Sequence, residues 1–271
     1  MNPDVGFVGA GKMVSAIVHA ILNSNLYTSS DIICCSAQDG TSERLSSETS
    51  ILRSESIEEM LEFKPSILIL GCKPQQFDLL PESISSDTSG SLIISIMAGI
   101  TIDRLNKCFP EARNIVRSMP NTPGQIGAGI TGYLFANDPD EYDRQLTESL
   151  LSSLGEVVEL PQESDIDALT AVSGSGPAYL FEFACALEEA ARATGLSDEL
   201  CKQLARQTII GSAKLLEHNN ETSPEELRKQ VTSPNGTTQA ALESFSENNL
   251  REIVRKAVIA AQIRSKELSS G

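Results

Sequence analysis

Short apolar runs alternate with helical patterns through roughly the first 160 residues of the chain. The apolar runs predict strands at Val5–Val8, Ile32–Cys35, Ser66–Leu70, Leu92–Ile96, Asn114–Arg117, Gly129–Phe135 and Glu156–Glu159. Helical spacing predicts helices at Lys12–Ser24, Ser56–Phe63, Phe77–Ser83, Thr101–Cys108 and Asp138–Ser153. Alternating strands and helices are typical of a parallel sheet covered by helices. We therefore expect an α/β N-terminal domain, residues 1–160, with a predominantly parallel sheet.

After Pro161 the pattern becomes helical, and the clearest periods are Ala178–Thr194, Ser197–His218 and Leu250–Leu268. The last of these segments is apolar on more than one face. A helix of that kind is buried on several sides, which an interface between two chains would supply. We expect residues 161–271 to form an all-α C-terminal dimerisation domain that also binds substrate.

A glycine-rich loop joins the first strand to the first helix. Gly9 permits a tight turn, and Gly11 lets the backbone approach a pyrophosphate at the helix N-terminus. Val14 stands where the third glycine of this fingerprint is usual. A glycine-rich turn without a ligand is the alternative, but the strand before and the helix after favour a Rossmann-type dinucleotide site.

The second strand ends at Cys35-Ser36, and the first acidic residue after it is Asp39. NAD-selective folds usually place an acid at the end of this strand to bind the ribose 2′-hydroxyl. Its absence favours NADPH, and the Ser36 hydroxyl could donate to a 2′-phosphate. NADH remains the alternative cofactor.

Composition excludes several other classes of function. The net charge of −16 argues against a nucleic-acid or anionic-membrane partner, and no stretch approaches the ~20 apolar residues of a membrane span. The six cysteines show no CxxC spacing, which favours free thiols in a reducing cytoplasm. With only two histidines, a metal site or a histidine-dependent triad is a poor hypothesis.

Six segments together resemble the Δ1-pyrroline-5-carboxylate reductases over nearly the whole chain. The two most specific are VSGSGPAY, residues 172–179, and VTSPNGTT, residues 231–238. The others are GAGKM at 9–13, GCKPQ at 71–75, MAG at 97–99 and MPNTP at 119–123.

The resemblance, together with the position of these loops after the strands, assigns the cofactor contacts. The expected cofactor-binding residues are Val8, Gly9, Ala10, Gly11, Lys12, Met13, Ser36, Gly71, Cys72, Lys73, Pro74, Met97, Ala98, Gly99 and Asn121. Loops at the carboxyl edge of a parallel sheet are where dinucleotides bind.

The segment from Ser233 to Thr238 is the expected substrate site. Hydroxyls and free amides at the start of a helix suit a carboxylate, and the expected contacts are Ser233, Gly236, Thr237 and Thr238. The resemblance also implies that Thr238 bonds the ring nitrogen, which makes it the candidate catalytic residue. Glu163 and Ser175 are candidate second contacts. A helix N-terminus without a ligand is the alternative interpretation.

Asn235 departs from the glycine that the family commonly has at this place. We expect the turn to survive, because asparagine tolerates left-handed backbone angles best after glycine.

The resemblance implies the reduction of Δ1-pyrroline-5-carboxylate to L-proline, the last step of proline biosynthesis, in a homodimer or a larger oligomer built on dimers. One alternative is another imine or 3-hydroxyacid oxidoreductase of this architecture. Such dehydrogenases usually carry a catalytic lysine in the long helix, and residues 172–194 contain none. The other alternative is a non-catalytic dinucleotide-binding protein.

Overall fold

The computed structural model describes residues 2–37 and 39–270, which form two compact units. Residues 1–175 together with 261–271 make the first unit, and residues 176–260 make the second. We call these the dinucleotide unit and the helical unit. The two units are defined by how compactly their residues pack. The expected boundary at residue 160 separates a cofactor-binding domain from a substrate-binding and dimerisation domain, and it stays a prediction.

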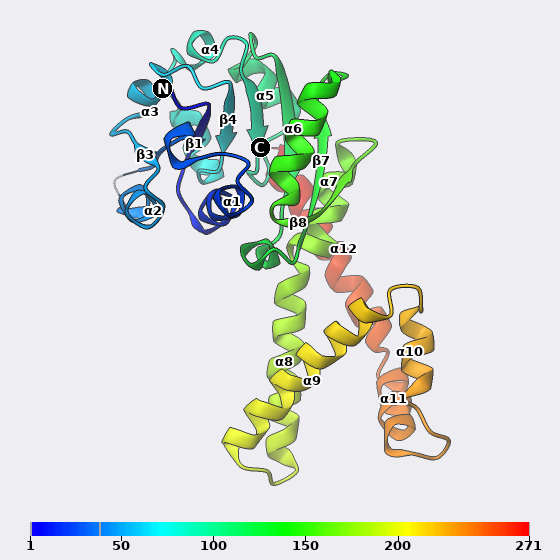
Figure 1. Cartoon of the computed structure of the whole chain (residues 1–271). Coiled ribbons are helices and arrows are strands. Elements are labelled where there is room, and N and C mark those ends of the chain that lie inside the picture. The colour runs from blue at the N-terminus through cyan, green and yellow to red at the C-terminus, as the bar shows by residue number, and fades with distance from the viewer. Residues whose placement is uncertain (1, 38, 271) are drawn as a thin grey trace. The chain divides into compact units, whose positions relative to one another are not determined.

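The dinucleotide unit contains one eight-stranded sheet (Figure 1). In spatial order its strands are β3 (Leu52–Arg53), β2 (Ile32–Cys35), β1 (Val5–Val8), β4 (Ile67–Leu70), β5 (Leu92–Ser95), β6 (Asn114–Met119), β7 (Gly129–Phe135) and β8 (Gly155–Glu159). Every neighbouring pair is parallel except β6 and β7. The predicted α/β class and the predominantly parallel sheet are confirmed.

Helices pack on both faces of this sheet. They are α1 (Lys12–Asn23), α2 (Thr41–Thr49), α3 (Ile57–Leu61), α4 (Ile84–Asp87), α5 (Ile102–Cys108), α6 (Glu141–Ser152) and α7 (Ser164–Leu169). Side chains alternate along each strand, so Ile69 belongs to the core beneath α1 and α6, and Leu70 to the core beneath α3 and α5. Burial on both faces explains why the strands read as continuous apolar runs.

Helix α2 and strand β3 are among the elements that the sequence pattern did not predict. Helix α2 consists mainly of Ser, Thr and Glu and buries only Ser42 and Leu45, so it carries no apolar stripe. Strand β3 has two residues.

The predicted helix at Phe77–Ser83 is wrong. A 3₁₀ helix spans Pro74–Leu79, and α4 begins only at Ile84. Leu80 is extended, with ψ 144°, because it precedes Pro81, and the residue before a proline is pushed out of the helical region.

The helical unit contains α8 (Gly176–Ala193), α9 (Asp198–His218), α10 (Pro224–Gln230), α11 (Thr237–Glu247) and the first half of α12 (Leu250–Ser270). α8 packs on α9, yet large apolar side chains remain exposed on these helices. They include Leu180, Phe181, Leu204, Ile210, Leu215, Phe245, Ile253, Val254 and Ile259. Within the described residues, no helix is long and apolar enough to cross a membrane.

Candidate active site

The glycine loop brings the backbones of β1 and β4 into direct contact. Gly9 has φ +102°, and a Cβ at this position would lie 2.7 Å from the carbonyl oxygen of Gly71. Gly9 donates its amide hydrogen to the Cys35 carbonyl at 2.7 Å. The left-handed φ and the lack of space both require glycine at position 9.

Gly11 is the N-cap of α1 and has extended backbone angles. It has no side chain to cap the helix, and a Cβ built there meets nothing within 4 Å. The first-turn amides therefore face an open approach, the arrangement that binds an anion at a helix N-terminus. Lys12 and Met13 are the first two residues of the helix, so the expected order of strand, turn and helix is confirmed.

Val14, which replaces the third glycine of the fingerprint, is 1% exposed and packs beside Gly71. A Cβ at position 71 would lie 2.3 Å from Cγ2 of Val14. Gly71, directly after β4, thus leaves the space that lets helix α1 approach the sheet closely, whereas in the usual fingerprint a glycine on the helix does so.

A cavity of about 530 Å³ opens where β1, β2 and β4 end. Strand β1 lies between β2 and β4, so this is the switch point of the sheet, the place where such folds bind ligands. The predicted residues that line it are Val8, Gly9, Ala10, Gly11, Ser36, Gly71, Cys72 and Lys73. Sequence reasoning missed further lining residues, among them Asp39, Thr41, Ser56 and Gln76.

Hydroxyl groups and an acid meet at the end of β2. The Ser36 hydroxyl accepts from Thr41 Oγ1 at 3.1 Å and from the Ser42 amide at 3.2 Å. Asp39 Oδ1 accepts from the Thr41 hydroxyl at 2.6 Å and from its amide at 3.0 Å. These bonds lower the pKa of Asp39, so a carboxylate stands 3.4 Å from Ser36 Oγ.

The same wall of the cavity holds more negative charge. Glu55 and Glu58 line it. The nearby Arg53 guanidinium is bound by Glu43 and Glu55. This end of the cavity therefore carries hydroxyl groups, and the Arg53 guanidinium near it is already paired with carboxylates.

The Met97–Gly99 loop follows β5. Met97 is 3% exposed, and the Cys72 thiol donates to its sulfur at 3.5 Å. Burial raises the pKa of Cys72, which therefore stays a neutral thiol at physiological pH. Because Cys72 lines the cavity and contacts Met97, the Cys72 side chain connects the loop to the cavity.

Asn121 links two of the motif segments. Its Nδ2 donates to the Ser173 carbonyl at 3.2 Å, and its Oδ1 accepts from the Ile130 amide at 3.0 Å. Ser173 lies in a π-helical turn, Thr170–Gly174, and the Ser175 amide closes this turn on the Thr170 carbonyl at 2.8 Å. π-Helical turns are rare in proteins, and those that occur inside helices often lie at functional sites.

Glu163 is held by two partners in the dinucleotide unit. Its Oε1 accepts from Arg117 Nη1 at 2.5 Å and from the Ile102 amide at 2.7 Å. Arg117 is 2% exposed, so this ion pair is buried on the arginine side. A contact from Glu163 to substrate stays a prediction.

The expected substrate segment lies in the helical unit. Asn235 has φ +57°, and its amide donates to Gln239 Oε1 at 2.8 Å. Gly236 is the N-cap of α11, which begins at Thr237. The expected turn is therefore confirmed, with asparagine in the left-handed region. Thr238 is half-buried, whereas Ser233 and Thr237 are exposed.

The sheet order and the glycine loop define a dinucleotide-binding protein of the Rossmann class. Residues 163–268 match the family model described as pyrroline-5-carboxylate reductase dimerisation. Residues 4–99 match the model for NADP oxidoreductase, coenzyme F420-dependent. The chain is 35% identical over 266 residues to pyrroline-5-carboxylate reductase of Vibrio alginolyticus, covering 97% of each protein. It belongs to the pyrroline-5-carboxylate reductase family.

Solved structures of this family have the same fold. The Coxiella burnetii pyrroline-5-carboxylate reductase matches with a TM-score of 0.89 and 33% identity, over 99% of each chain. The Plasmodium falciparum pyrroline carboxylate reductase with NADP bound matches with a TM-score of 0.83 and 31% identity, over 99% of this chain and 98% of that one.

Proposed function

We propose that this protein reduces Δ1-pyrroline-5-carboxylate to L-proline with NADPH, as the last step of proline biosynthesis. The cavity at the sheet's switch point, in a chain that matches reductases of this family along nearly its whole length, is the observation that carries the proposal. The Ser233–Thr238 turn supports it, because hydroxyls and free amides at the start of α11 suit the carboxylate of the substrate.

NADPH is the proposed cofactor, with NADH as the alternative. Ser36 and Thr41 supply hydroxyl groups at the end of β2, where the adenosine ribose binds in folds of this class. The NADP-bound Plasmodium falciparum relative supports the same choice. The proposed phosphate contacts are the first-turn amides of α1 with Gly9, Ala10 and Gly11.

The dinucleotide supplies the hydride that reduces the imine carbon. The chain's own contribution is to bind, orient and desolvate the substrate. We assign the carboxylate of the imine to the N-terminus of α11, with the hydroxyls of Ser233 and Thr237, and the ring nitrogen to Thr238. A protonated imine is already electrophilic, so a hydrogen bond at the nitrogen suffices without a strong general acid.

The proposed assembly is a homodimer, or a larger oligomer built on dimers. The matching family model is named for dimerisation, and it covers the helices whose apolar side chains are exposed in the single chain. A cavity of about 1060 Å³ between α8 and α9, lined by Leu180, Phe181 and Ile210 among others, has the apolar character of an interface. The described cysteines are free thiols, which supports a cytoplasmic location.

The deciding experiment is oxidation of NADPH by the purified protein with and without Δ1-pyrroline-5-carboxylate, with proline identified as the product. A matched assay supplies NADP⁺ with a panel of 3-hydroxyacids. Turnover of the imine alone supports the proposal. Turnover of a hydroxyacid instead, or tight binding of NADPH without any turnover, overturns it in favour of one of the two alternatives.

A further inference from the structure

The last turns of α12 belong to the dinucleotide unit, although the helix begins in the helical unit. They lie against the Met97–Gly99 loop. Gly99 has φ +76°, and a Cβ built on it would lie 3.0 Å from the carbonyl oxygen of Leu268 and 3.3 Å from its carbonyl carbon. The loop therefore packs backbone against backbone on the end of α12, a contact that no side chain can adjust.

Hydrogen bonds hold this end of α12 in place. Ser265 donates to Asp167 Oδ1 at 2.6 Å, and Ser269 lies 3.4 Å from the same oxygen. Arg117 Nη2 donates to Ser269 Oγ at 3.4 Å, while its Nη1 binds Glu163. Asp167 is 7% exposed and Arg117 2%, so the partners of the helix end are buried polar groups with little access to water.

Arg117 has hydrogen-bonding capacity to spare. Its Nε is buried without a partner among the residues that the structure describes. A buried guanidinium that lacks some of its hydrogen bonds depends strongly on those that it makes. Loss of the Ser269 hydroxyl would remove one more of its hydrogen-bond partners.

The other side of the same loop leads to the cavity. The Met97 amide donates to Ser95 Oγ at 3.3 Å, and the Met97 sulfur accepts from Cys72, which lines the cavity. Three residues after the loop, the Ile102 amide at the start of α5 is bound by Glu163. The loop is thus fixed between the cavity and the end of α12 by contacts on both sides.

We propose that the C-terminal end of α12, through Leu268 and Ser269, is a positioning element for the Met97–Gly99 loop and so sets the affinity for the dinucleotide. This inference rests on the proposed function and on the expectation that Met97, Ala98 and Gly99 bind the cofactor. Leu268 and Ser269 touch the loop and its supports, and they are positioning residues rather than catalytic ones.

The first test compares two glycine substitutions with the same backbone strain. Gly99 has φ +76° and Gly90 has φ +77°, but only Gly99 faces Leu268, and a Cβ on Gly90 meets nothing within 4 Å. Gly99→Ala should weaken NADPH binding, followed by fluorescence in the absence of the imine, by about tenfold or more. Gly90→Ala should bind NADPH like the wild type.

The second test removes the helix end. A chain that stops after Lys266 lacks Leu268 and Ser269, and the penalty of Gly99→Ala should be much smaller in that background. Equal penalties in both backgrounds would show that Leu268 is not the residue that Gly99→Ala disturbs, and would overturn the inference.

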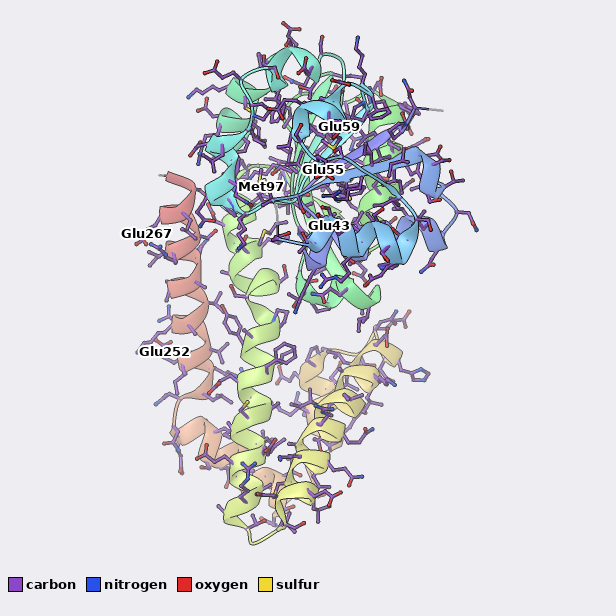
Figure 2. All side chains as sticks on the ribbon, turned by 90° about the vertical axis from the view of Figure 1, so that its left-hand side faces the viewer. Glu43, Glu55, Glu59, Met97, Glu252 and Glu267 are labelled. Carbon is purple, nitrogen blue, oxygen red and sulfur yellow. The ribbon has the colours of Figure 1, made fainter. Side chains whose placement is uncertain are left out.

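The third test needs no bound cofactor. Hydrogen exchange of the amides from 97 to 102 should be faster in Ser269→Ala than in the wild-type apoprotein, because the support of the loop is weakened. Glu267→Ala is the matched control, since Glu267 is exposed, pairs with Arg264 and points away from Met97 (Figure 2). Ser269→Ala also serves if the shortened chain fails to fold.

The two ideas fail in different ways. Wild-type protein that does not bind NADPH contradicts the proposed function. Wild-type protein that binds NADPH, with Ser269→Ala matching it in both loop exchange and NADPH affinity, contradicts only the positioning role.

Discussion

Val14 fills the space that a side chain at Gly71 would need, with Cγ2 of Val14 2.3 Å from the position of a Cβ on residue 71. The usual fingerprint places a small residue on the helix to let it approach the sheet. Here the helix carries the larger residue, and the chain segment after β4 carries the smaller one. The larger residue at position 14 is therefore matched by a glycine at position 71, 57 residues later in the sequence.

Gly71→Ala should destabilise the protein by about 1–3 kcal/mol, the usual cost of overpacking a filled core. The second-site change Val14→Ala should restore part of that loss, because it removes the clashing methyl groups. Denaturant unfolding of the two single variants and the double variant measures the coupling. Additive effects of the two changes would mean that the residues do not share this space.

Asp39→Asn should raise the preference for NADPH over NADH, which we expect already in the wild type. Hydrogen bonds from Thr41 lower the pKa of Asp39, so the wild-type side chain is charged at neutral pH and opposes a 2′-phosphate nearby. Removing the charge should change the ratio of kcat/KM for the two cofactors by about three- to tenfold.

Asp31→Asn is the matched control for this prediction. Asp31 also accepts from a threonine hydroxyl and amide, those of Thr28, but it precedes β2 and does not line the cavity. A similar change in cofactor preference for both variants would exclude a local effect at the ribose end of the cavity.

Thr238→Ala should lower kcat/KM for the imine while NADPH affinity stays nearly constant. One hydrogen bond to a charged group contributes roughly 1.5–3 kcal/mol, which corresponds to about ten- to a hundredfold. Thr238→Ser keeps the oxygen and should recover much of the activity. If Thr238→Ala turned over the imine at the wild-type rate, the proposal that the substrate binds at the N-terminus of α11 would be contradicted.

Val254→Glu should dissociate the oligomer or unfold the chain, because it places a charge on the exposed apolar face of α12. Sedimentation at micromolar concentration measures the result. Tyr142→Glu is the comparison, since Tyr142 is 62% exposed and lies on α6 of the dinucleotide unit. A wild-type protein that sediments as a stable monomer would contradict the proposed assembly.

The sequence was most informative where local pattern decides the structure. Strands such as Ile67–Leu70 are buried on both faces, and their unbroken apolar runs reveal them. The Gly9–Gly11 loop is visible because one short segment carries the whole turn. By contrast, α2 buries a single leucine, so its helical state depends on contacts that no local period records.

Contacts between distant segments could not be predicted. Arg117 and Glu163 are far apart in the sequence, and nothing in either segment specifies that they pair. The same holds for Asn121, whose amide joins a turn to the Ser173 carbonyl, and for Leu268 beside Gly99. Such pairs depend on the packed arrangement of the unit, which periodicity does not encode.

The dinucleotide unit is discontinuous along the chain, because the helical unit is inserted between residues 175 and 261. A ribosome therefore makes most of the unit first and its final helical turns last. Until those turns emerge, Arg117 and Asp167 lack Ser265 and Ser269, and the loop at Gly99 lacks Leu268. Domains fold as units during synthesis. In this chain the dinucleotide unit can be completed only after the helical unit and the residues up to Ser269 have been translated, so a product that stops within the helical unit lacks part of it.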